Sequence, residues 1–183
     1  MPITVDAYTM GGVASGVLSR PGHLREVMEQ DGRLDLERVQ WRPLDGAPQE
    51  TTSVSIPIDD VLIAVADGES AIPIHAQWHA IRLELGPYVV EGEMPTMPGF
   101  DPGRALTRPS GEFVLLRDVR LGRRSADEAA PANVAIGSEA LINRYVVEAV
   151  SADLMLGFFF PGAEMISSEP DDLGTPALGG AKG

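Results

Sequence analysis

Two segments of the chain alternate apolar and polar residues as strands do, and the alternation breaks once in each. In RLDLERVQW the apolar positions are Leu34, Leu36, Val39 and Trp41. Side chains of a strand alternate between its two faces, so the phase slips at Glu37–Arg38. In VLLRDVRL the slip recurs at Arg117–Asp118. An extra residue of this kind is a β-bulge, which bends and twists its strand. We therefore expect a curled, barrel-like sheet.

The two phase slips are 80 residues apart, from 37 to 117, and further matches keep the same offset. They pair Ile3, Val5, Tyr8 and Gly12 with Leu83, Leu85, Tyr88 and Gly92, and residues 54–56 with residues 134–136. Self-similarity at one offset indicates an internal repeat. We predict that residues 3–66 and 81–150 are two copies of one unit. The expected core residues are Leu34, Leu36, Val39, Val54, Ile56, Val61, Val114, Leu116, Val119, Val134, Ile136 and Leu141.

The other patterns predict many short strands and one short helix. The 20 glycines and 15 prolines favour strands and turns over long helices. Only HLREVMEQ has apolar residues at helical spacing, namely Leu24, Val27 and Met28. We expect a mainly β fold, a tandem repeat of two small, bent, five-stranded, barrel-like units with one short helix. The expected ranges are 1–70 for the first unit, 71–80 for a linker, 81–166 for the second unit and 167–183 for a flexible tail.

The composition excludes several classes of function. The 27 acidic and 14 basic residues give a net charge of −13, which argues against a nucleic-acid partner. The absence of cysteine excludes disulfides, thiolate catalysis and cysteine-ligated metals. The longest apolar runs, Val61–Ala66 and Leu154–Phe160, are far shorter than the roughly 20 residues of a membrane helix. The amino terminus lacks the pattern of a cleaved signal, so we expect a cytoplasmic location and no membrane partner.

No catalytic or cofactor motif emerges from the sequence. His75 and His79 lie in an extended pattern, where residues four apart are roughly 13 Å from each other and cannot share one ion. Ser15 and Ser138 lack the Gly-x-Ser-x-Gly context of a nucleophile elbow. Gly11-Gly12 fits a hairpin turn better than a phosphate loop. We therefore expect no catalytic residue, no metal and no cofactor, and a protein that is not an enzyme.

The one basic cluster is the strongest candidate for a contact site. It comprises Arg117, Arg120, Arg123 and Arg124, beside the expected bulge and in the turn that follows. Nearby acids, among them Asp118, favour a solvated hairpin end. The alternative is a site for an anion or for an acidic partner.

The order of elements resembles the small five-stranded barrel of Sm-like proteins. The stretches that carry the resemblance are GVASGVL, RLDLERVQW and VSIPIDDVLIAV, and later VVEGEM, FVLLRDVRL and VAIGSEALINRY. The Asp/Asn pair and Arg-Gly turn with which that family holds RNA are missing. Residues 56–59 and 136–139 occupy the expected turn instead, with acids in place of arginine. The chain is also similar to an uncharacterised bacterial domain of the same strand pattern.

The expected function is therefore a non-catalytic module that acts through protein contacts or self-assembly. Exposed strand edges of such units need partners, and Sm-like barrels pair these edges between subunits in rings. We expect a protein partner or a homo-oligomer that persists at micromolar concentration. Leu154–Phe160 either packs on a partner or folds back on its own chain. The alternatives are a small-ligand-binding barrel, an undetected hydrolase, or a divergent Sm-like RNA-binding protein, which the net charge disfavours.

Overall fold

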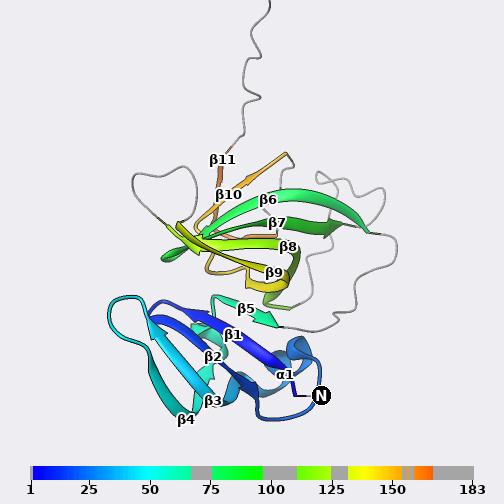
Figure 1. The fold of residues 1–183 in the computed structure, drawn as a ribbon. Coiled ribbons are helices and arrows are strands. Elements are labelled where there is room, and N and C mark those ends of the chain that lie inside the picture. The colour runs from blue at the N-terminus through cyan, green and yellow to red at the C-terminus, as the bar shows by residue number, and fades with distance from the viewer. Residues whose placement is uncertain are drawn as a thin grey trace, which may run out of the picture.

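The fold is mainly β, as predicted. A computed structural model describes residues 2–66, 76–96, 111–124, 132–153, 156 and 159–166, with the backbone alone at 132–136. Within these residues, eleven strands form one sheet in the order β11-β10-β6-β7-β8-β9-β5-β1-β2-β3-β4. Strands β4 and β11 are therefore the two edges of the sheet, and they lie at opposite ends of the molecule (Figure 1). Within the described ranges, no helix has the length and apolar character needed to cross a membrane.

The first run of strands pairs in the order β5-β1-β2-β3-β4. A tight turn closes the β1–β2 hairpin at Thr9↔Gly12, as expected for the Gly-Gly turn. The helix α1 forms where the apolar spacing predicts it, and it buries Leu24, Val27 and Met28. The elements are β1 (Thr4–Thr9), β2 (Gly12–Leu18), α1 (Leu24–Asp31), β3 (Arg33–Pro43), β4 (Gln49–Pro57), the 3₁₀ turn η1 (Ile58–Asp60) and β5 (Ile63–Ala66).

The second run pairs in the corresponding order, β10-β6-β7-β8-β9, and β11 adds to β10 in parallel. Its strands are β6 (Gln77–Leu85), β7 (Tyr88–Thr96), β8 (Phe113–Arg123), β9 (Ala132–Asn143), β10 (Ala149–Ala152) and β11 (Glu164–Ile166). Antiparallel pairing of β5 with β9 joins the two runs into one sheet.

Both predicted bulges are present. Arg38 and Asp118 have left-handed backbones, with φ of 52° and 50°. At each place two residues of the long strand face a single glycine, Gly16 on β2 or Gly92 on β7. A Cβ on Gly16 would lie 3.0 Å from the Glu37 carbonyl oxygen, and one on Gly92 would lie 2.9 Å from that of Arg117. The strands approach so closely here that glycine is required.

The constant offset of 80 residues is wrong outside the third strands. The bulge glycines, Gly16 and Gly92, are 76 residues apart, so Gly92 takes the position of Gly16 and not of Gly12. In the fourth strands Val54 pairs with Leu36 as Ala140 pairs with Leu116, a separation of 86. Connections of different length between the strands change the offset, which an ungapped comparison of the sequence cannot follow.

The second expected turn, at residues 136–139, is also wrong. Strand β9 runs through these residues, and the chain turns after it at Arg144–Tyr145. The first turn is confirmed at η1. The strand continues through Gly137 because β8 pairs with it on both sides of this residue, with Val119 opposite Gly137 itself.

Two apolar clusters fill the interior, and each takes residues from both runs of strands. Ile63 of β5 packs in the cluster formed mainly by β6–β10, whereas Phe113, Leu115 and Leu141 pack in the cluster formed mainly by β1–β5 and α1. Of the expected core residues, those with described side chains are buried, except that Val54 is half-buried. The side chains of Val134 and Ile136 lie outside the described residues.

The described part of Leu154–Phe160 folds back on its own chain. Leu156 and Phe160 are fully buried in the cluster of the second run, beside Val147 and Val150. The chain then turns and adds β11 to the sheet.

Candidate protein-contact site

The structure holds Arg117 of the predicted basic cluster by several contacts. Its Nη2 lies 2.6 Å from Oε2 of Glu93 on the neighbouring strand β7. Its guanidinium carbon also lies 3.7 Å from the centre of the Trp78 ring, in a cation–π contact. The side chain is two-thirds buried, so these contacts fix it against the sheet.

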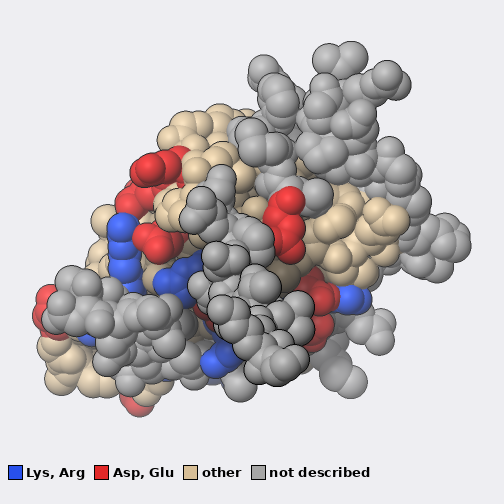
Figure 2. Space-filling view, turned by 90° about the horizontal axis from the view of Figure 1, so that it is seen from above, with Lys and Arg blue, Asp and Glu red and all other residues tan. Residues whose placement is uncertain are grey.

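Arg124 is also held by carboxylates. It bridges Glu148 and Glu84, at 2.8 and 3.0 Å. Arg123 lies 3.9 Å from Asp45, and exposed Arg120 makes no ion pair with the described residues. Arg117, Arg123 and Arg124 therefore each lie near an acid, and acidic and basic residues are interspersed on the face seen in Figure 2. An anion or acidic partner at this cluster has to compete with these carboxylates.

The edge strand β4 offers a different kind of contact. Residues Gln49–Ser53 and Ser55 are exposed, and the sequence QETTSVSIP contains no lysine or arginine. Its only charge is Glu50 at one end, and its only proline is Pro57 at the other. Edge strands that resist pairing normally carry charges, prolines or bulges in the middle. Residues 51–56 of β4 contain no charged residue and no proline.

The hydrogen-bond pattern shows which groups of β4 are available. The Ile58 amide donates to the Gly32 carbonyl oxygen at 3.1 Å. Bonded and non-bonded pairs alternate along an antiparallel ladder, so Ile56 and Val54 also bond to β3. Ser55 and Ser53 lie between these positions. Their amide and carbonyl groups therefore point away from β3, toward the free edge.

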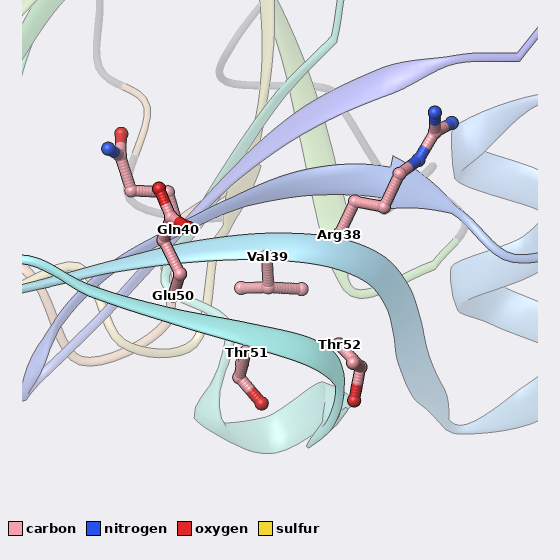
Figure 3. Close-up of a pocket in the computed structure, with 6 residues that line it drawn as sticks. All are labelled: Arg38, Val39, Gln40, Glu50, Thr51 and Thr52. Atoms are coloured by element: carbon pink, nitrogen blue, oxygen red, sulfur yellow. The ribbon is translucent and has the colours of Figure 1, made fainter.

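A hollow of about 490 Å³ lies along the same hairpin (Figure 3). Arg38, whose backbone is left-handed, is one of the residues that line it. The polar side chains around it carry both signs of charge and no convergent set of donors or acceptors. Its lining residues are Arg38, Val39, Gln40, Glu50, Thr51 and Thr52. This hollow therefore widens the β4 surface and does not define a small-molecule site by itself.

The junction of β5 with β9 shows how this sheet joins two edges. The Asn143 amide donates to the Leu62 carbonyl oxygen at 2.9 Å, which makes Ala64↔Leu141 the next bonded pair. Ile63 and Ile142 face each other between these pairs, and both are fully buried. The edge strand of one run thus joins the fourth strand of the other through a short antiparallel ladder sealed by two isoleucines.

A pair of tyrosines packs beside this junction. The rings of Tyr8 and Tyr88 meet edge to face, with centres 5.3 Å apart, and the Tyr88 hydroxyl donates to the Thr9 carbonyl oxygen at 3.0 Å. Burial raises the pKa of each to about 12, and the charge of Asp6 adds to the shift at Tyr8. Both hydroxyls remain protonated at neutral pH, so the pair is a structural contact.

The other residues singled out in the sequence lie apart. His79 is on β6 as expected, with Nε2 2.9 Å from the Thr96 hydroxyl, whereas His75 lies outside the described residues. Ser15 accepts from Arg42 at the surface of β2, and Ser138 is an exposed residue of β9. Sequence reasoning missed the β4 edge, although the uncharged run TTSVSI could have indicated it.

Comparison with known proteins found no family model, no curated protein and no solved structure that matches the chain.

Proposed function

We propose that this chain is an assembly module whose β4 edge pairs with a strand of another protein chain. The observation that carries the proposal is an exposed edge strand of nine residues with outward amide and carbonyl groups and no blocking residue in its middle. Adding a strand to such an edge satisfies these groups, and the backbone bonds supply affinity.

A second copy of this chain is the partner that the structure favours. The sheet already joins a β5-type edge to the fourth strand of the other run, in β5·β9. Strand β10 holds the position in the second run that β5 holds in the first, since it pairs antiparallel with β6 as β5 pairs with β1. One copy therefore carries both halves of a junction of this kind, β4 at one end and β10 near the other.

We also propose that the two runs are copies of one five-stranded unit. Three observations support this: the shared pairing order, the bulges at Arg38 and Asp118, and the glycines that face them. The proposed duplication makes β10 the equivalent of β5, and β9 the equivalent of β4. Of these edge strands, β5 and β9 pair with each other inside the chain.

The test is the mass in solution, measured by light scattering coupled to size exclusion from about 1 to 100 µM. We expect a mass above the 19.5 kDa of one chain, rising with concentration. Ser55→Pro removes an outward amide and should return the mass to one chain, while Ser55→Ala keeps the amide and should leave association unchanged. Ser55→Lys is a second blocking variant that needs no change of backbone. A mass of one chain for the unmodified protein throughout would refute self-assembly.

A further inference from the structure

We propose that β11 is an exchangeable plug that covers the β10 edge and thereby limits self-assembly. This inference rests on the proposed function and names its regulation. Strand β11 occupies the place on β10 that β4 of a second copy requires. Association then demands that β11 leave, so the plug sets the concentration at which copies join.

The overlap of the two binding sites follows from the strand register. Strand β11 pairs with Ala149, Val150 and Ser151, the first three of the four residues of β10. In the internal junction, the corresponding residues of β5 are Ile63, Ala64 and Val65, and these pair with Ile142, Leu141 and Ala140. The edge used inside the chain for assembly is thus the edge that β11 covers in the second run.

The register of the second copy can be read from the same comparison. Ala149 pairs with Glu84 as Ile63 pairs with Tyr8, and Ala140 pairs with Leu116 as Val54 pairs with Leu36. If β10 and β4 of a second copy pair in the register of β5 and β9, the β10 residues Ala149, Val150 and Ser151 face Ile56, Ser55 and Val54 of that copy.

The plug is held weakly. It has three residues, it pairs in parallel, and Ile166 exposes 44% of its surface. Its hold includes the bond from the Glu164 amide to the Glu148 carbonyl oxygen, at 2.7 Å. The chain before it is anchored by fully buried Phe160, so β11 can leave while that anchor stays in the core.

The incoming strand is also weaker than the internal one, which makes exchange possible. Where Asn143 donates to Leu62 inside the chain, the second copy would present Pro57, which has no amide hydrogen. Where the internal junction has Ile63 and Val65, β10 has the smaller Ala149 and Ser151. Two ladders of modest strength, one internal and one between copies, therefore compete for one edge.

Pairing of β4 with β10 is a head-to-tail contact, because the two strands lie in different parts of the sheet. Such contacts produce closed rings or open filaments according to the rotation between copies. A plug on the β10 edge controls how readily a ring or a filament grows. It leaves the fold of each copy intact.

The experiment compares Glu164→Pro with its matched control, Glu164→Ala, in the full chain. Proline removes the amide that donates to Glu148, whereas alanine keeps it. Loss of a hydrogen bond from the plug should lower the concentration for half-association about tenfold. Ile166→Pro, which removes the next amide directed at β10, should act in the same direction. Circular dichroism and urea unfolding verify that each variant is folded.

Cross-linking then tests the register, in a chain that has no cysteine of its own. Val54→Cys with Ser151→Cys, in the Glu164→Pro background, places two thiols in a facing non-bonded pair, close enough for a disulfide under mild oxidation. We expect covalent multimers that disappear on reduction. Each single-cysteine variant should give none, and dimers of the Val54→Cys variant alone would show β4 pairing with β4 and overturn the proposal.

The outcomes separate the plug from the assembly that it regulates. Tighter association of Glu164→Pro than of Glu164→Ala supports the plug. Equal association of both variants and the unmodified chain overturns the plug and leaves the proposed assembly standing. If no variant associates up to 100 µM, the proposed self-assembly fails and the plug fails with it.

Discussion

Substitution of Ile63 measures how strongly the two runs of strands depend on each other. Ile63 is fully buried, belongs to β5 of the first run, and packs in the apolar cluster of the second. Ile63→Ala removes three buried carbons. At about 0.8 kcal/mol for each, the lost burial is about 2.4 kcal/mol, and the cavity left beside Ile142 raises the expected loss to about 3–4 kcal/mol.

Each run contains one tryptophan, which gives each its own signal. Trp41 lies on β3 and Trp78 on β6. We expect urea unfolding, followed by fluorescence in the Trp41→Phe and Trp78→Phe backgrounds, to show one shared midpoint that falls for both signals when Ile63 is shortened. Ile63→Val is the control, with an expected loss of about 0.5–1.5 kcal/mol. A loss below about 1 kcal/mol for Ile63→Ala, or a midpoint that moves for one tryptophan only, would refute the interlocked core.

Three more perturbations test other parts of the structure. Gly92→Ala should cost about 1–3 kcal/mol in urea unfolding, because its Cβ meets the Arg117 carbonyl oxygen at 2.9 Å; an unchanged midpoint would contradict the close approach. The free energy of unfolding should fall as pH rises from about 10 to 12, because unfolded tyrosine loses its proton first; Tyr88→Phe should flatten that fall, and an identical profile would contradict the raised pKa. Arg124→Gln should change stability by less than about 1 kcal/mol, since its ion pairs are near the surface; a larger loss would show a buried role.

The sequence was sufficient for features that depend on neighbouring residues. The helix at Leu24–Asp31 follows from apolar spacing, and the first hairpin follows from alternation around Gly11-Gly12. Both bulges were found from a break in the period of two, because a strand with one face in the core cannot shift phase without an extra residue.

Features that depend on distant partners could not be predicted in this way. Residues 133–143 read as two strands around Gly137, yet β9 is continuous because β8 pairs with it from Ala132 to Asn143. The burial of Ile63 in the other run, and the ion pair of Arg117 with Glu93, likewise require the register between strands far apart in sequence.

The β4 edge also depends on distant partners, which explains why the sequence indicated the arginine cluster instead. A cluster of arginines is visible in any sequence, but pairing with carboxylates occupies Arg117 and Arg124. The β4 edge has no conspicuous residue, and its importance comes from its place at the end of the strand order. The two edges also differ in protection: β10 is covered by its own chain, whereas Ser53 and Ser55 of β4 direct backbone groups outward. In the proposed assembly, β11 has to leave before β4 of a second copy can pair with β10, so we expect control of assembly to act at β10.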